Sequence, residues 1–204
     1  AHRDLPPAAR QRARYATMAL FFIAGMAYAS WGVHVPTVRD KFHLDPAALS
    51  LALFVLTGGS IAATVTNAKW IARVGTRRAC LVGGLVMAGG MALILVAPTY
   101  AVLLPVLAVF GAGMATMDVA MNAEASAVEQ ALGRPIMSSL HGMFSIGGMI
   151  GAGAGGLALA HGMTGALHLL LAALVCVVVL ALSCPAGLPQ VPHAESHHGE
   201  AGAS

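Results

Sequence analysis

The sequence predicts an all-α membrane protein whose six transmembrane helices form a 3+3 inverted repeat. Of its 204 residues, 58% are hydrophobic and 9% are charged, whereas soluble domains carry about 25% charged residues. The charges are clustered, and short sequence patterns recur at an offset of about 88 residues. Four stretches contain no Asp, Glu, Lys or Arg: residues 15–38, 46–68, 79–117 and 135–194. This composition excludes a soluble enzyme, a nucleic-acid-binding domain and a disulfide-linked scaffold.

The lengths of the uncharged stretches give the number of spans. A transmembrane helix needs roughly 20 apolar residues, so the first two stretches hold one helix each and the longer two hold two each. Turn residues divide the longer stretches at residues 98–100 and 161–164. The predicted helices cover about residues 16–38, 47–68, 79–97, 101 onward, 138–160 and 165–183.

The basic residues predict the orientation of these spans. With the N-terminus inside, nine Lys and Arg residues fall on the cytoplasmic side, and Arg39 and Lys41 fall outside. We therefore expect both termini in the cytoplasm and the bundle in the inner (plasma) membrane. The expected segments are a basic cytoplasmic segment over residues 1–15, the bundle over 16–187 and a disordered cytoplasmic tail over 188–204.

The internal repeat relates the first three spans to the last three. The pattern Ala-Gly-Met-Ala at residues 24–27 recurs at 112–115, and Gly58-Gly59 recurs as Gly147-Gly148. Three spans per copy place the two copies in opposite orientations, as in the inverted repeats of secondary transporters. That architecture predicts binding groups near the membrane midplane.

A loop between the second and third spans points to a known family. Residues 69–78 resemble the signature of the major facilitator superfamily, with its basic and glycine positions at Arg73, Gly75, Arg77 and Arg78. The usual Asp of that signature falls on Ala72, and the leading Gly falls on Ala68. The resemblance implies the N-terminal half of a twelve-helix transporter and covers about residues 16–187.

A second segment narrows this resemblance. The run from Asp118 to Asn122 is similar to the Glu-x-x-x-Asn segment of fucose:proton symporters, whose acidic residue in the first span falls on Gly32 here. The resemblance implies that Asp118 takes the acidic, proton-coupling position and that Asn122 takes the amide position.

The residues themselves favour a polar cluster on two neighbouring spans. Asp118 and Asn122 are four residues apart and share a helix face, and a carboxylate in the hydrocarbon core is costly unless it faces a wet cavity. Counted from the loop that joins the spans, His141 matches Asn122 in depth and Ser145 matches Asp118. The alternatives are a carboxylate that only reaches the interface and a histidine that binds headgroups or helix-end carbonyls.

The first span supplies further candidates for a solute site. Trp31 and His34 could line a cavity for a sugar-like ligand, with Tyr28 one turn before Trp31. The alternatives are a place for Trp31 in the aromatic belt at the membrane surface and an interfacial role for His34.

Together these features predict secondary active transport of a small polar solute, proton-coupled and driven by alternating access. The expected partners are the solute, protons, the lipid bilayer and a second six-helix half, with no nucleic acid. No enzyme activity, cofactor or metal is expected. The alternative is a truncated membrane protein that assembles with a partner half and transports nothing.

Overall fold

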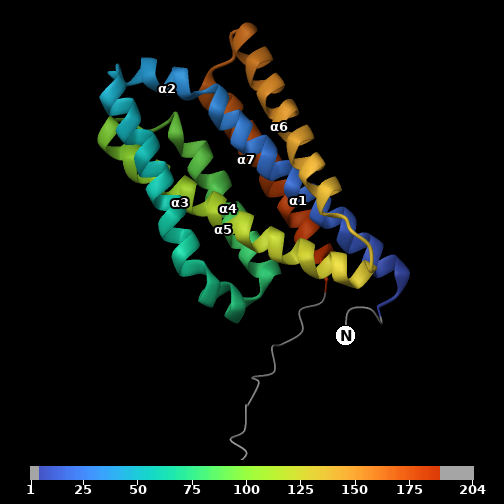
Figure 1. The fold of residues 1–204 in the computed structure, drawn as a ribbon. Coiled ribbons are helices and arrows are strands. Elements are labelled where there is room, and N and C mark those ends of the chain that lie inside the picture. Colours follow the sequence, from blue (N-terminus) through green and yellow to red (C-terminus); the bar gives the residue numbers. More distant parts are fainter. Residues whose placement is uncertain (1–4, 189–204) are drawn as a thin grey trace, which may run out of the picture.

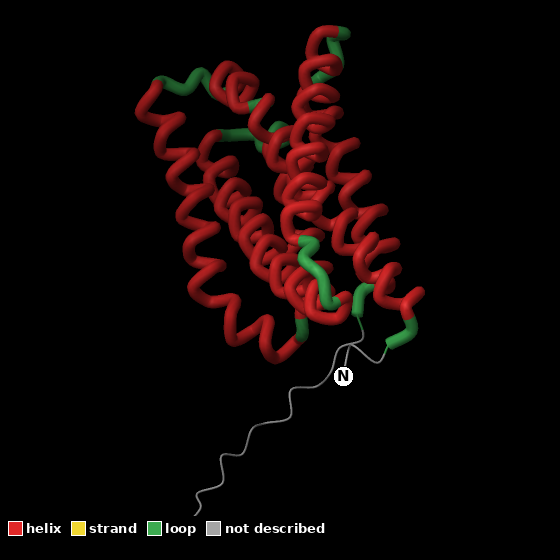
Figure 2. The backbone as a smooth tube through the Cα atoms, turned by 45° about the vertical axis from the view of Figure 1, so that its right-hand side comes forward, coloured by secondary structure: helices red, strands yellow, loops and turns green. Residues whose placement is uncertain are grey.

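The computed structural model describes residues 5–188, and every regular element among them is a helix (Figures 1 and 2). The elements are α1 (Pro7–Val33), α2 (Val35–Lys41), α3 (Pro46–Val74), α4 (Thr76–Ile94), α5 (Tyr100–Leu132), α6 (Met137–Ala160), α7 (Gly165–Ser183) and the short 3-10 helix η2 (Cys184–Ala186). Six segments are long and apolar enough to cross a membrane when α1 is taken together with α2 and α7 with η2. The predicted number of spans is therefore confirmed. The predicted tail lies almost wholly outside the described residues.

Local signals set the ends of several helices. Asp45, Thr99 and Thr164 are the N-cap residues of α3, α5 and α7, and each side chain accepts a hydrogen bond from a backbone N–H three residues ahead. Helix α5 ends at Gly133, whose φ of 66° lies in the left-handed region that glycine adopts without a steric penalty. The turns expected near residues 98–100 and 161–164 lie at two of these boundaries.

Two helices, α1 and α3, are longer than the apolar stretches predict. Helix α1 begins at Pro7, so the expected boundary between residues 15 and 16 falls inside it, and α3 continues to Val74. Hydropathy marks only the part of a helix that lies in hydrocarbon, whereas charged residues beyond it still form helix. The first turns of α1 are held against α5 because Arg10 Nη1 donates a hydrogen bond to the carbonyl of Ala131 at 3.0 Å.

The packing shows the inverted repeat. The first copy consists of α1, α3 and α4, and the second of α5, α6 and α7. Helix α1 packs most extensively on α6, and its counterpart α5 packs on α3, so each first helix contacts the second helix of the other copy (Figure 1). The neighbours form a row in the order α3, α5, α1, α6, and α4 and α7 pack behind α5 and α1.

Glycines allow the backbones of both pairs to approach closely. A Cβ on Gly147 of α6 would lie 2.0 Å from the carbonyl oxygen of Phe22 in α1, and one on Gly59 of α3 would lie 2.1 Å from that of Ala108 in α5. Small residues commonly line such helix–helix contacts in membranes. The Gly58-Gly59 and Gly147-Gly148 pairs of the repeat therefore lie at equivalent interfaces.

The two ends of the bundle differ in charge. The start of α1, the α3–α4 turn and the α5–α6 loop lie at one end, together with the end of η2 (Figure 1). We call this the basic end, because the Lys and Arg residues of these segments gather there. The opposite end, called the α2 end, carries Arg39 and Lys41.

Candidate functional site

Asp118 lies exposed on the row of helices, on α5. One turn further along α5, Asn122 donates a hydrogen bond from Nδ2 to Asp118 Oδ1 at 3.2 Å and another to the Asp118 carbonyl at 2.9 Å. The predicted shared face of the two side chains is therefore present. This arrangement fixes the carboxylate on the surface of the helix, where a proton or a polar solute can reach it.

His141 brings a second titratable group to the same surface from α6. Its ring packs edge-on against Phe21 of α1, with 5.4 Å between ring centroids, and the side chain stays exposed. It interacts electrostatically with Asp118, across α1, which separates α5 from α6 along the row. The depth matching from the sequence paired His141 with Asn122 and Ser145 with Asp118, and those pairings stay a prediction.

Ser145 lies one turn beyond His141 and is also exposed. Its hydroxyl donates a hydrogen bond to the carbonyl of His141 at 3.2 Å, within α6 itself. This bond leaves the hydroxyl oxygen able to accept a hydrogen bond from a solute on the same face.

The three candidate residues on α1 differ in their exposure and contacts. Tyr28 is 58% exposed, whereas Trp31 is 6% exposed and packs edge-on against Phe110 of α5 at 6.0 Å between ring centroids. Trp31 is therefore part of the contact between α1 and α5, and neither the expected cavity lining nor the aromatic belt describes its position. His34 is fully buried at the α2 end, away from Asp118.

The sequence interpretation missed the partner of His34. His34 Nε2 lies 2.8 Å from Nδ1 of His168 on α7, and His168 is only 7% exposed. A histidine inside an apolar run signals that a buried polar group needs a partner. The sequence does not say which of the other helices provides that partner.

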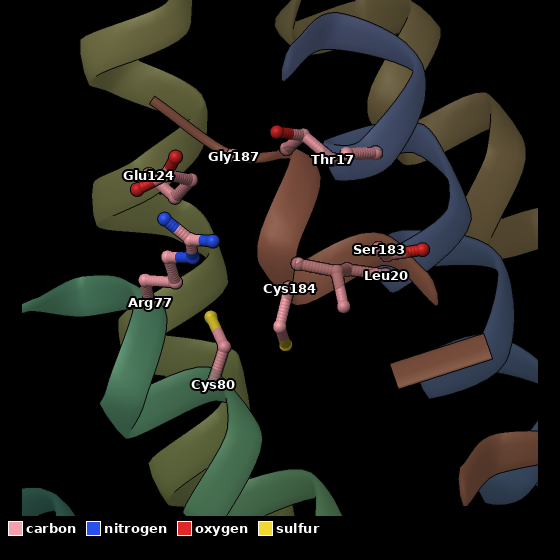
Figure 3. A pocket seen from close by; sticks show the side chains of 9 residues that line it. Thr17, Leu20, Arg77, Cys80, Glu124, Ser183, Cys184 and Gly187 are labelled. Atoms are coloured by element: carbon pink, nitrogen blue, oxygen red, sulfur yellow. The ribbon is translucent and has the colours of Figure 1, made fainter. Parts of the chain in front are cut away.

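The signature loop lies at the basic end. Gly75 separates α3 from α4 with a φ of 86°, a conformation that a side chain strains. Arg73 and Arg78 are exposed to the surroundings, whereas Arg77 is half-buried and lines a small cavity between α1, α4, α5 and η2 (Figure 3).

Glu124 of α5, which the sequence interpretation also missed, lines the same cavity. It is 5% exposed and accepts hydrogen bonds from Thr76 Oγ at 2.6 Å and from the backbone N–H of Leu188 at 3.0 Å. In Figure 3 Glu124 and Arg77 lie on the same side of this cavity. The signature lacks its Asp at Ala72, and α5 supplies a carboxylate to this basic loop instead.

A further buried polar contact joins α3 to α5. Asn67 Nδ2 donates a hydrogen bond to Thr116 Oγ at 2.8 Å, which satisfies an amide that would otherwise be unpaired in hydrocarbon. Among residues 5–188, no three His, Cys, Asp or Glu side chains come together as a metal site, and Cys80, Cys176 and Cys184 are buried free thiols.

Comparisons with known proteins agree with this architecture. The family model described as Major Facilitator Superfamily matches residues 17–202. The chain is 40% identical over 67% of its length to an uncharacterized MFS-type transporter of Yersinia pestis, and 33% identical over 66% to the uncharacterized transporter y4wD of Sinorhizobium fredii. It is also 32% identical over 64% to the membrane protein MosC of Rhizobium meliloti. These matches span 36%, 36% and 32% of the relatives' own lengths.

Proposed function

Because the chain belongs to the major facilitator superfamily, we propose that it is the N-terminal half of a secondary active transporter for a small polar solute. The observation that carries this proposal is Asp118, which lies exposed on the row α3, α5, α1, α6 with Asn122 bound to it. Transport proceeds by alternating access, in which the bundle rocks against a second six-helix half around a central site.

The second half covers the polar strip formed by Asp118, His141, Ser145 and Tyr28. A charged residue facing lipid costs about 2.5–3.5 kcal/mol on insertion scales, so this strip needs a protein partner or a water-filled cavity. The chain spans about a third of the length of the relatives that it matches. The second half therefore comes from the same polypeptide, where the chain is part of a longer protein, or from another chain.

Proton coupling is assigned to Asp118, with the His141 side chain on the same exposed surface. The similarity of the Asp118–Asn122 run to the Glu-x-x-x-Asn segment of fucose:proton symporters supports this assignment. Asn122 orients the carboxylate, and Tyr28 and Ser145 face the path of the solute, for which hydroxyl-rich, sugar-like molecules are the best match. The excess of basic residues at one end supports insertion into the inner membrane with both termini cytoplasmic.

The test is uptake by proteoliposomes that hold the complete transporter or the two halves together. Radiolabelled neutral monosaccharides and polyols serve as probes, with and without an inward proton gradient. Asp118→Asn keeps the shape of the side chain but removes its titration. It should abolish gradient-driven accumulation and leave counterflow exchange partly intact, because exchange moves no net protons.

Two controls sharpen this test. Asp118→Glu retains a titratable carboxylate and should retain part of the accumulation, and Asp40→Asn, in the exposed α2, should leave it unchanged. Gradient-driven accumulation at the wild-type level in Asp118→Asn would refute the coupling role. Transport by a demonstrated single bundle without a second half would refute the half-transporter proposal.

A further inference from the structure

The α2 end of the bundle contains a buried pair of histidines from α1 and α7. His34 Nε2 and His168 Nδ1 are 2.8 Å apart, and the two side chains are 0% and 7% exposed. The residues are 134 positions apart in sequence. The pair therefore ties the first and last spans of the chain together.

The fold leaves space for these two rings. His34 is the residue at which α1 ends and α2 begins, with φ and ψ of −95° and 4°, and His168 is in the first turn of α7. Two glycines line the rings. A Cβ on Gly165 would lie 2.9 Å from His34 Nδ1, and one on Gly155 of α6 would lie 3.1 Å from His168 Cε1.

The inverted repeat provides a counterpart at the basic end. The offset of 88 relates α1 to α5 and places the counterpart of His34 at Asn122, two residues before Glu124. Glu124 is bound to Thr76, the first residue of α4, and α4 is the counterpart of α7. Each end of the bundle thus has a buried polar contact between the first helix of one copy and the start of the third helix of the other. Only the contact at the α2 end consists of two imidazoles.

Two imidazoles in this geometry respond to protons in steps. In the neutral pair, one of the facing nitrogens carries a hydrogen and donates it to the lone pair of the other. One added proton can be placed on a nitrogen outside the contact, and the N–H···N bond survives. A second added proton gives both facing nitrogens a hydrogen, so the bond is lost and two cations face each other.

The surroundings of the pair offer no counter-charge among the described residues. Within α2, the neighbour of His34 is the Thr37 hydroxyl, whose oxygen lies 3.4 Å from Nδ1. The nearby residues of the other elements are Gly155 of α6, Gly165 of α7 and Leu95 at the end of α4. The charged groups of α2 are engaged elsewhere: Arg39 pairs with Asp40, and Lys41 donates to the carbonyls of Leu95 and Ala97. His161, at the end of α6, is exposed and bonds to the Leu157 carbonyl of its own helix.

We propose that His34 and His168 form a proton-binding latch that holds the α2 end of α1 against α7 and opens when both rings are protonated. Opening admits water to the rings and lets α2 move away from the start of α7. The latch is separate from the coupling role of Asp118, because the pair lies at the end of the bundle and away from the row of polar side chains. Its ligand is the proton.

The test is the distance between α2 and α7 as a function of pH. Spin labels are placed on cysteines introduced at Asp40 and Leu167, both exposed, in a full chain whose three native cysteines are replaced by alanine. Pulsed electron resonance in lipid nanodiscs should show one narrow distance at about pH 8 and an additional longer population at about pH 4, below the range in which an exposed histidine titrates, because both buried rings must carry a proton at once. An unchanged distance distribution between these pH values overturns the proposal without any histidine variant.

Histidine variants then show which group causes the pH-dependent change in distance. His34→Gln together with His168→Gln removes both titratable rings, and the distances should become independent of pH. His161→Gln, close to α7 in sequence but exposed, should keep the wild-type response. A pH response that persists in the double variant, or that disappears in His161→Gln, assigns the proton to another group and overturns the latch. The transport assay for Asp118 has a different readout, so either proposal can fail alone.

Discussion

The contact between α1 and α6 gives the sharpest test of the packing, through the substitution Gly147→Ala. The new Cβ would lie 2.0 Å from the carbonyl oxygen of Phe22, whereas carbon–oxygen contacts in proteins lie near 3.3 Å. The helices would have to separate by roughly 1.3 Å to restore that contact distance. Both sides of the contact are helix backbone, so no side-chain rotation can relieve the overlap.

The magnitude follows from a comparison with Gly153→Ala in the same helix, where a Cβ meets nothing within 4 Å. Both substitutions gain the helix propensity of alanine, up to about 1 kcal/mol, so their difference isolates the overlap. Overpacking costs about 1–3 kcal/mol, and 1 kcal/mol shifts the Tm of a chain of this size by about 2–4 °C. Gly147→Ala should therefore unfold about 2–12 °C below Gly153→Ala.

The measurement is thermal unfolding of the purified full chain in one detergent, followed by circular dichroism. Gly25→Ala provides a second reading of the same interface, because its Cβ would lie 2.0 Å from the carbonyl oxygen of Phe144. Equal midpoints for Gly147→Ala and Gly153→Ala would show that α1 and α6 do not approach as closely as described. That result would refute the reasoning from backbone contact.

Three further predictions concern the ends of the bundle. Glu124→Gln neutralises the carboxylate that accepts hydrogen bonds from Thr76 and Leu188 and should lower the free energy of unfolding by about 1.5–3 kcal/mol. The control is Glu129→Gln, which neutralises the carboxylate bound to the backbone N–H of Ile136 at the start of α6. In denaturant titrations, a loss for Glu124→Gln no larger than that for Glu129→Gln would contradict a special role for the basic-end contact. Lys41→Met removes the ammonium that caps the end of α4 and should lower the Tm. Arg39→Met, at an exposed ion pair, should change the Tm little. Similar Tm shifts for the two variants would contradict the capping role. A tag placed after Ser204 should be protected from protease added outside intact cells and cleaved after lysis, and cleavage in intact cells would reverse the proposed topology.

The number of spans could be predicted from the sequence because charged residues are strongly excluded from the hydrocarbon core of a membrane. Charged residues in hydrocarbon cost several kcal/mol, so the charge-free stretches mark the spans directly, and all six helices are present. The lengths of the helices could not be predicted in the same way. The residues from Pro7 to Arg14 carry three arginines, yet they continue α1, because helix formation outside the hydrocarbon depends on contacts such as that between Arg10 and Ala131.

For the candidate site, the sequence indicates the depth of a side chain along its span but not the direction in which that side chain points. Counting from the loop that joins the two spans predicts that His141 lies at the depth of Asn122 and Ser145 at the depth of Asp118, and this matching stays a prediction. The direction in which a side chain points needs a clear polar stripe, and these helices are apolar on nearly all sides. Trp31 and Tyr28, three residues apart, were therefore grouped together, although one is buried against Phe110 and the other is exposed.

Some polar side chains of this bundle are paired within the chain, whereas others need a partner from outside it. Two buried polar contacts are made within the chain: His34 with His168 at the α2 end, and Asn67 with Thr116 between α3 and α5. Lipid can cover the exposed apolar faces of α3 and α6 without cost, so those faces do not demand a partner. Asp118 is different, because its bond to Asn122 leaves the carboxylate exposed and lipid cannot solvate it. The strip around Asp118 is therefore the part of the surface that requires a second half or water, as a solute pathway between two halves requires.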